Sequence, residues 1–411
     1  MPDKQVDVCV IGAGAAGISC AHGLARRGYS VALLERLHPL PDCLKAEKIE
    51  PEAILALIRF GFQAAVDEVA TPLHNVAVYF GERALGTLQL DPPEAGLYYP
   101  DLINSLRKHI DPRVDFLPSL KATAIEQQPN GVQVITDKDT RITCKLAILA
   151  TGDARHLLEQ LGAVYENQPP NHVFAAAFTF EGTLGSPDSP LDSVTYHHPV
   201  PDGPIAYATF FKLGASLRAN IFCPGPTSDD WQRDLKHKPL EAMSGYSHVL
   251  AKASRSWRAT SPVITRKMQV SRATPPTAPR VVVLGDAAHI IDPSGSGGLT
   301  FALMEAELLL SSYLPDWLSN SECDPAAFYN DPRRKGALDE FFARGRYIYA
   351  LNHDPSLPGK SRRLKFALDH LIASRFHGRP ASVQPNGAPA WRLPAPFLYE
   401  QFAEDARPSR K

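Results

Sequence analysis

Three glycines near the N-terminus have the spacing that lets a backbone turn bind a pyrophosphate. Gly12, Gly14 and Gly17 form a Gly-x-Gly-x-x-Gly run that also contains Ala15 and Ala16. The first glycine permits a tight turn, the second lets a phosphate approach the backbone, and the third lets a helix pack closely on a strand. The free N–H groups at the start of such a helix attract phosphate oxygens. The run therefore predicts a dinucleotide site.

The elements around these glycines are those that such a turn requires. Residues 6–11 form an apolar strand, an Ala- and Leu-rich helix continues to Arg27, and residues 30–35 form a second strand. Glu35 ends the second strand, roughly 20 residues after the first glycine, where a carboxylate can accept hydrogen bonds from a ribose diol. An acid there favours FAD or NAD over NADP.

A second motif suited to a flavin follows a buried strand at residues 281–284. Its residues are Gly285, Asp286, Ala287, Ala288 and His289, followed by Asp292, Pro293, Ser296, Gly297, Gly298 and Leu299. An acid at a strand end can bind a ribityl hydroxyl, and glycines at a helix start present N–H groups to the electron-rich edge of an isoalloxazine ring. Together the two motifs predict non-covalently bound FAD.

The composition indicates a globular protein with little overall charge. The 411 residues are 44% hydrophobic and 21% charged, which is enough apolar material for two lobes that share a ligand cleft. With 43 basic and 44 acidic residues the formal net charge is -1, so no overall field attracts nucleic acid or an anionic membrane. We therefore expect no nucleic-acid partner. Without a run of about 20 apolar residues, we also expect no integral membrane segment.

The cysteines and the N-terminus favour a cytoplasmic protein. The six cysteines are scattered singly, without the close pairs of a metal site or a redox disulfide. The first strand begins too early for a secretion signal to precede it. We therefore expect a reduced, cytoplasmic setting and no bound metal.

The rest of the chain alternates between two kinds of pattern. A hairpin around Asn130 and Gly131 precedes a buried strand at residues 146–149, where the chain returns to the nucleotide domain. Residues 173–222 alternate β-branched and aromatic side chains, which is typical of an antiparallel sheet and predicts a substrate lobe. The chain is helical after Asp324, and residues 380–411 form a Pro- and Arg-rich tail.

With both motifs in place, the chain resembles the p-hydroxybenzoate-hydroxylase-like flavoprotein superfamily over residues 6–314. That superfamily includes the group A aromatic hydroxylases, flavin-dependent halogenases and geranylgeranyl reductases. The resemblance implies an α/β fold with a Rossmann-like FAD-binding domain of the GR2 type, an inserted, mainly antiparallel β-sheet substrate domain, and C-terminal helices. The expected boundaries are 1–72, 100–170 and 270–330 for the FAD domain, 73–99 and 171–269 for the substrate domain, and 331–411 for the C-terminal region.

The resemblance also implies which residues contact FAD. Asp286 would contact the ribityl chain, the glycines that follow it would lie beside the ring, and Glu35 would bind the ADP half. The full expected set is Gly12, Gly14, Ala15, Ala16, Gly17, Glu35, Arg36, Lys45, Ala122, Thr151, Gly152, Asp286, Pro293, Gly297, Gly298 and Leu299.

Three positions depart from the usual hydroxylase pattern. Lys45 stands where an arginine is common, which keeps a cation but loses the planar guanidinium fork. Tyr99 stands where an arginine or glutamine often meets the ribityl chain, and Thr151 replaces the aspartate of the middle motif. Because that motif is linked to both FAD and NAD(P)H, the electron donor stays open: NADPH or NADH reduces the flavin directly or through a separate flavin reductase.

Several chemistries share this scaffold, and we expect hydroxylation. In that reading a reduced flavin captures O2, and its C4a-hydroperoxide gives one oxygen to an aromatic or polycyclic small molecule. Halogenation is an alternative, although the chain has no Trp-x-Trp-x-Ile-Pro run and no lysine between residues 62 and 80. Double-bond reduction is another, although His289 stands where the geranylgeranyl reductases have glycine. The altered middle motif also leaves open a non-catalytic flavin-binding partner protein.

The sequence does not identify a catalytic base. His197, His198 and His289 are candidates for deprotonating a phenol, and strand alternation would point only one of the first two inward. Aromatic residues of the predicted sheet are candidates for the pocket wall, namely Tyr207, Phe210 and Phe211.

Overall fold

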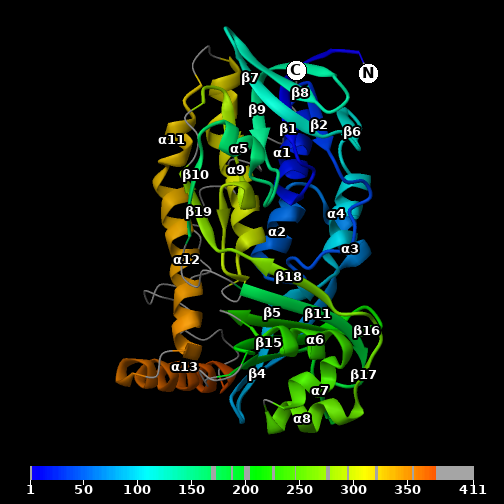
Figure 1. Cartoon of the computed structure of the whole chain (residues 1–411), viewed down its shortest axis with the longest axis vertical. Coiled ribbons are helices and arrows are strands. Elements are labelled where there is room, and N and C mark those ends of the chain that lie inside the picture. Colours follow the sequence, from blue (N-terminus) through cyan, green and yellow to red (C-terminus); the bar gives the residue numbers. More distant parts are fainter. Residues whose placement is uncertain are drawn as a thin grey trace.

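The computed structural model places two β-sheets one above the other along an elongated molecule (Figure 1). It describes residues 2–375 apart from gaps at 168–172, 187, 199–203, 225–226, 246, 275–277, 294–295, 320–322 and 354–355. The predicted tail at residues 380–411 lies outside the described residues. The predicted α/β fold with a Rossmann-like domain, a β-sheet domain and C-terminal helices is confirmed.

The upper sheet is the nucleotide-binding sheet, with strands in the order β6-β2-β1-β9-β8-β7 and β20 beside β9. Strands β6, β2, β1, β9 and β20 run parallel, whereas β7 and β8 form the predicted hairpin with β9. The strands are β1 (Lys4–Ile11), β2 (Val31–Glu35), β6 (Val114–Pro118), β7 (Ala122–Gln128), β8 (Gly131–Thr136), β9 (Arg141–Leu149) and β20 (Val281–Val283).

The two faces of this sheet pack against different hydrophobic clusters, because alternate strand residues point to opposite sides. Val8 and Val10 pack beneath the helices, whereas Cys9 and Ile11 face a second cluster that includes α5. The helices of this domain are α1 (Ala15–Arg26), α2 (Pro51–Arg59), α3 (Gln63–Val69), α4 (Tyr99–Lys108), α5 (His156–Gln160), α9 (Gly298–Ser312) and α10 (Leu314–Ser319).

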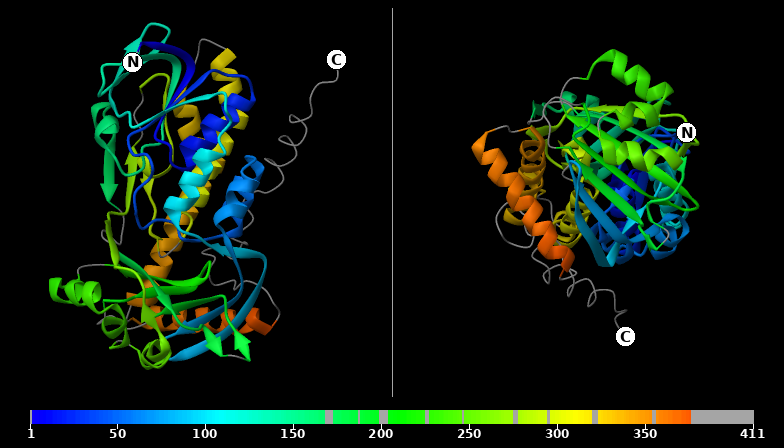
Figure 2. Two further views of the ribbon diagram at one scale, coloured as in Figure 1. Left: turned by 90° about the vertical axis from the view of Figure 1, so that its right-hand side faces the viewer. Right: turned by 90° about the horizontal axis from the view of Figure 1, so that it is seen from below.

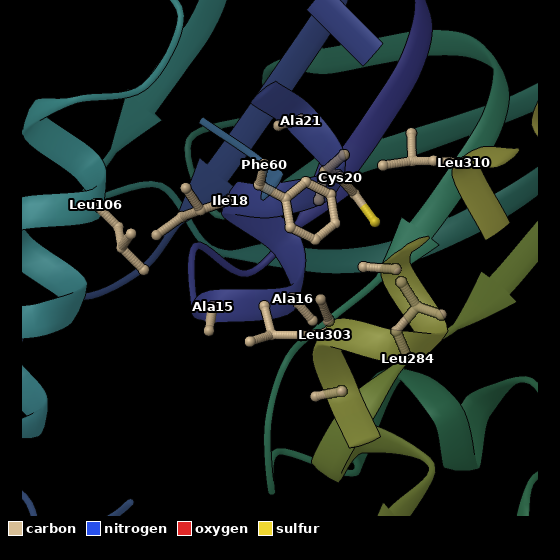
Figure 3. Close-up of a cluster of buried hydrophobic side chains, with 14 of the residues drawn as sticks. Ala15, Ala16, Ile18, Cys20, Ala21, Phe60, Leu106, Leu284, Leu303 and Leu310 are labelled. Atoms are coloured by element: carbon tan, nitrogen blue, oxygen red, sulfur yellow. The ribbon is translucent and has the colours of Figure 1, made fainter. Parts of the chain in front are cut away.

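The two motif helices pack directly on each other in the centre of the domain. Figure 3 shows Ala16, Cys20 and Ala21 of α1 near Leu303 and Leu310 of α9. Small side chains on α1 permit this approach, and a methyl group added at Gly23 would lie only 2.7 Å from Leu310 Cδ1. This contact therefore brings together the N-termini of two helices that lie far apart in the sequence.

The lower sheet has nine strands in the order β17-β11-β16-β15-β14-β4-β5-β3, with β18 beside β11. Its pairings are antiparallel except for β14 with β4. The strands are β3 (Lys48–Ile49), β4 (Thr71–Phe80), β5 (Arg83–Gly96), β11 (Val173–Glu181), β14 (Ser193–His197), β15 (Tyr207–Leu213), β16 (Ser216–Pro224), β17 (Arg258–Ala259) and β18 (Ile264–Met268). This sheet also takes in β3 and the start of β4, which lie within the segment 1–72 expected for the FAD domain.

Two smaller sheets accompany the two main ones. A three-stranded sheet contains β10 (Val164–Asn167), β19 (Ser271–Thr274) and β21 (His289–Ile290), and a two-stranded one contains β12 (Gly185–Ser186) and β13 (Ser189–Pro190). Three short helices pack on the lower sheet, on the side away from the nucleotide domain: α6 (Asp229–His237), α7 (Pro239–Ser244) and α8 (His248–Ala253).

The C-terminal helices join the two halves. After α11 (Pro325–Tyr329), the long α12 (Pro332–His353) runs down the side of the molecule and α13 (Leu357–Arg375) crosses the lower sheet (Figure 2). Phe366 of α13 is buried against Phe80 and His197 of the sheet. Among the described residues, no helix combines the length and the apolarity needed to cross a membrane.

Candidate functional site

The glycine turn has the shape that the fingerprint predicts. Gly12 has a positive φ of 103°, and a Cβ on it would collide with the Ala150 carbonyl. A Cβ on Gly17 would collide with the Gly12 carbonyl, so this glycine holds α1 tightly on the turn. A Cβ on Gly14 would meet nothing within 4 Å, because this residue faces the open cavity at the start of α1. The turn therefore leaves room for a phosphate at Gly14.

Glu35 is held in place beside this turn. Its carboxylate accepts hydrogen bonds from the N–H groups of Ala13 and Leu37, both at 2.8 Å, and lies 3.0 Å from Arg107 Nη2. The buried Arg107 also donates to the Ala13 carbonyl at 2.9 and 3.1 Å. Among the described residues, Oε2 already has two partners, whereas Oε1 accepts only from Leu37 and keeps capacity for a further hydrogen bond, so Glu35 fits a ribose hydroxyl.

Two adjoining cavities lie over the predicted cofactor residues. The first is lined by Gly12, Gly14, Glu35, Arg36, Lys45, Ala122, Thr151 and Gly152 from the predicted set. The second is lined by Gly14, Ala15, Ala16, Lys45, Gly152, Asp286, Pro293, Gly297, Gly298 and Leu299. Gly14, Lys45 and Gly152 line both cavities, which therefore meet at these residues. Of the predicted set, only Gly17 lines neither, and it acts through packing.

A salt bridge lies where the two cavities meet. Lys45 Nζ is 2.7 Å from Asp286 Oδ2, so the structure brings together two residues predicted to contact the flavin half of FAD. Burial alone would lower the pKa of Lys45, but the Asp286 carboxylate, with a smaller effect from Tyr99, raises it above its usual value. Lys45 is therefore a permanent cation beside the predicted ribityl path.

A buried network fixes the turn that carries Asp286. The Gly285 N–H donates to Glu305 Oε2 at 2.7 Å, and Glu305 Oε1 accepts a hydrogen bond from Arg334 Nε at 2.7 Å. Arg334 Nη2 lies 2.9 Å from Nε2 of His289 at the other end of the turn. Because a guanidinium only donates, His289 Nε2 must accept. Of the candidate bases, His289 is therefore assigned to this structural network, and it does not line either cavity.

Two arginines of the site, Arg107 and Arg266, were not predicted from the sequence. Arg107 contacts the glycine turn from α4, and Arg266 reaches from β18 to line both cavities. Arg266 Nη2 lies 2.9 Å from Asp153 Oδ2, and its Nη1 donates to the Leu44 carbonyl at 3.2 Å. Nothing near Arg266 in the sequence indicates this role, because its partners come from distant segments.

One face of the lower sheet forms the wall of the second cavity. Tyr207, Thr209, Asn220 and Phe222 line it, and they alternate with core residues along β15 and β16. Of the aromatic residues considered for this wall, only Tyr207 lines the cavity. Phe210 faces the opposite side and packs against Trp257, whereas Phe211 is fully buried away from the cavity.

The other two candidate bases are buried in the sheet. The ring of His197 lies 4.9 Å from that of Tyr207 and 5.0 Å from that of Phe366, on the same side of the sheet as the cavity. His198 lies near Tyr196 instead. Neither histidine lines the cavities, so strand alternation correctly distinguishes the two sides without identifying a base.

Charged residues from one short segment join the cavity wall. Glu47 forms a bidentate pair with Arg218 at 2.7 and 2.9 Å, and Lys48 pairs with Glu94 at 2.8 Å. A third ion pair joins Glu50 to α12, with Glu50 Oε1 3.0 Å from Arg344 Nη1. Glu47, Lys48, Glu50 and Glu94 all line the cavity. The wall is therefore polar as well as aromatic, which the sequence did not predict.

The fold and the two adjoining cavities define a dinucleotide-binding flavoprotein in which a second sheet forms one cavity wall. The family described as FAD binding domain matches residues 5–314 of the chain. The chain belongs to this family and is an FAD-dependent oxidoreductase. The residues present fit FAD, because the open space at Gly14, the carboxylate of Glu35 and the Lys45–Asp286 pair lie along the two adjoining cavities.

Known proteins of several activities are similar to this chain. Over 83 residues it is 35% identical to squalene epoxidase ERG1 of Gibberella zeae, a match that covers 20% of this chain and 17% of that protein. It is 23% identical over 339 residues to the menaquinone reductase of Mycolicibacterium smegmatis, which covers 77% of this chain and 79% of the relative.

Solved structures share the fold at low sequence identity. The p-nitrophenol 4-monooxygenase PnpA from Pseudomonas putida DLL-E4 superposes with a TM-score of 0.73 at 17% identity, covering 91% of this chain and 95% of that one. The halogenase PltM, solved with phloroglucinol and FAD, superposes with a TM-score of 0.68 at 15% identity, covering 90% and 82%. At these identities the likeness establishes the fold alone.

Proposed function

We propose that the chain is an FAD-dependent monooxygenase that hydroxylates an aromatic or polycyclic small molecule. One observation carries the proposal: the cavity that begins at the phosphate-binding turn continues past Asp286 and Gly298 to a wall built from the substrate sheet. A flavin ring at Gly297–Leu299 would face that wall, so a ring compound bound there would lie against it. FAD would supply reducing electrons and O2 activation.

The residues of this chain have separate roles in the proposal. Gly12, Gly14 and α1 bind the pyrophosphate, Glu35 binds the adenosine ribose, and Asp286 binds the ribityl chain. Gly297 and Gly298 let backbone N–H groups at the start of α9 approach the ring. Lys45 adds a fixed positive charge near the flavin, which favours its anionic reduced form. Tyr207 and Phe222 present aromatic surface to a planar substrate.

Reduction of an isolated double bond is the second candidate, because the menaquinone reductase match covers most of both chains. The cavity wall disfavours it, since Glu47, Lys48, Glu50 and Glu94 would surround a hydrocarbon with charged groups. Halogenation uses the same fold, as the PltM likeness shows, but no feature of this cavity favours it over hydroxylation.

Anaerobic stopped-flow absorbance of the holoprotein tests the proposal. The protein is mixed with NADPH or NADH, with and without a panel of phenols, and a parallel sample receives a flavin reductase. Flavin bleaching in any arm, followed by phenol-dependent reoxidation with O2 and formation of a hydroxylated product, is the expected result. A flavin that is reduced but forms no hydroxylated product from any compound it binds would contradict hydroxylation.

A further inference from the structure

One part of the second cavity's wall presents hydrogen-bond acceptors, from Asn220, Glu50 and Glu94. Asn220 of β16 and Glu47 both line the cavity; burial raises the pKa of Glu47, and the Asn220 side chain opposes that rise. Because a carboxylate only accepts hydrogen bonds, this effect assigns the Asn220 NH2 group to the side of Glu47 and leaves Oδ1 as the free end of the amide. Asn220 is only 4% exposed, and its Oδ1 has no hydrogen-bond partner among the described residues.

An unpaired buried acceptor of this kind is costly unless a ligand satisfies it. Leaving a buried carbonyl without a hydrogen bond costs roughly 1–3 kcal/mol, so such groups are rare in native proteins. Asn220 lies directly opposite Thr209 in the sheet, and both line the cavity. A substrate N–H or O–H in the cavity would complete the set of hydrogen bonds.

The carboxylates around Asn220 have the same preference. Glu50 and Glu94 line the cavity, whereas Arg344 and Arg218, which balance the charges of this wall, lie behind it. Each carboxylate oxygen can accept a second hydrogen bond beyond its ion pair. Asn220, Glu50 and Glu94 therefore offer hydrogen-bond acceptors to a substrate at this part of the cavity wall.

Among the residues that the structure describes, three cations line this cavity, and each is already paired with a carboxylate: Lys45 with Asp286, Arg266 with Asp153, and Lys48 with Glu94. Lys48 Nζ lies 2.8 Å from Glu94 Oε2 and 3.4 Å from Thr195 Oγ1. A substrate carboxylate could bind Lys48 only in competition with Glu94, and it would face Glu50 and Asn220 Oδ1 at the same time. The wall is therefore suited to exclude carboxylates.

We propose that the substrate is a ring compound that presents hydrogen-bond donors, best supplied by an amine, to Asn220, Glu50 and Glu94. This inference rests on the proposed function, since it names the substrate class of the same cavity. It separates the chain from enzymes that bind hydrocarbons and from those that recognise aromatic acids. Charge-assisted hydrogen bonds from an ammonium would be stronger than those from a neutral donor.

Three compounds that share the same ring and the same tether length, and differ only in the group at the end of the tether, test the inference. Tyramine, 4-propylphenol and 3-(4-hydroxyphenyl)propionate end in an ammonium, a methyl group and a carboxylate. Their Kd values are measured from the perturbed absorbance of oxidised flavin in the holoprotein, and tryptamine, 3-propylindole and indole-3-propionate form a second series. We expect the amine of at least one series to bind about 10-fold or more tightly than the carboxylate, with the methyl compound between them.

Variants assign the preference to the wall. Asn220→Leu and Glu94→Gln should each reduce the amine-to-carboxylate ratio several-fold, while the exposed control Glu181→Gln should leave it unchanged. Retained FAD and an unchanged melting temperature show that each variant is folded. If one wall variant does not fold, the other still tests the inference.

Three results would overturn the inference: carboxylates that bind as tightly as amines, wall variants that keep the wild-type ratio, or no amine that perturbs the flavin. Binding is measured without NAD(P)H or turnover, so the failure of hydroxylation would leave this result intact. Likewise, hydroxylation of an aromatic acid would support the proposed function while contradicting this inference.

Discussion

Lys45 Nζ lies 2.7 Å from Asp286 Oδ2, at the point where the cavity beside the glycine turn meets the cavity beside the lower sheet. The two residues come from distant segments, the loop after β2 and the turn after β20. Their contact places a carboxylate and a cation together on the path that the ribityl chain of FAD would follow. Binding of the cofactor should therefore depend on both residues.

Asp286→Ala should lose FAD. Hydrogen bonds to a charged group contribute about 1.5–3 kcal/mol, so the Kd for FAD should rise roughly 10- to 100-fold. Lys45→Met should weaken FAD binding less, because the carboxylate remains. Gel filtration followed by flavin absorbance measures the retained cofactor, with the exposed Asp230→Ala as the matched control. Full occupancy in Asp286→Ala would show that the flavin lies elsewhere.

Substitutions at Gly14 and Gly17 should have opposite effects on folding and on the cofactor. Gly14→Val should fold, because a Cβ there meets nothing within 4 Å, but its side chain should block the pyrophosphate and yield apoprotein. Gly17→Ala should destabilise the fold itself, because its Cβ would collide with the Gly12 carbonyl. Thermal unfolding and FAD content separate the two effects. A Gly14→Val protein that retains FAD would refute the role given to this turn.

The buried Glu305–Arg334 pair should be strongly coupled. Removing one partner leaves a buried charge without its counter-ion, so Glu305→Gln and Arg334→Met should each cost about 3–5 kcal/mol of unfolding free energy. The double variant should lose less than the sum of the two. Urea denaturation measures these values, and Glu241→Gln in the exposed pair with Lys238 should cost less than about 1 kcal/mol. Additive losses would indicate independent residues.

His289 should make the protein less stable in mild acid. Burial, followed by the positive charges of Arg334 and Arg272, holds the pKa of His289 well below its usual value. Below a pH of about 6.5 the unfolded chain therefore binds a proton that the folded protein does not, so stability falls as the pH falls. This histidine contributes a slope of at most about 1.4 kcal/mol per pH unit.

Urea denaturation between pH 7.5 and pH 5, chosen to span the ordinary titration range of histidine at about 6.5, measures that slope. His289→Gln should reduce it, since an amide oxygen can still accept from Arg334 without titrating. The exposed His237→Gln serves as the control. An unchanged slope in His289→Gln would mean that another group carries the acid sensitivity.

The parts of the site that lie within one continuous segment were predictable from the sequence. Gly12, Gly14 and Gly17 act on one turn, and the spacing between them is set by that turn alone. The same is true of Asp286 and the glycines at the start of α9. Local backbone geometry constrains these residue types, so the motif is visible without knowledge of the fold.

The residues that the sequence did not reveal act across long separations. Arg107 contacts Ala13, and Arg266 contacts Asp153, only because the sheets and helices bring distant segments together. The paired charges of Glu47 and Arg218 are likewise isolated charges in the sequence and one buried unit in the fold. The sequence offered Tyr207, Phe210 and Phe211 alike for the cavity wall, and only the fold shows that Phe210 faces the other side and that Phe211 lies away from the cavity.

Oxygen transfer is the central claim, and one isotope measurement tests it most directly. The compound that perturbs the bound flavin most strongly is turned over under isotopically labelled oxygen gas, with NADPH or NADH and a flavin reductase present. The account predicts a product whose ring carries one labelled oxygen atom for each molecule hydroxylated. A product that gains hydrogen or halide instead, or oxygen from water, would contradict the assignment of a monooxygenase.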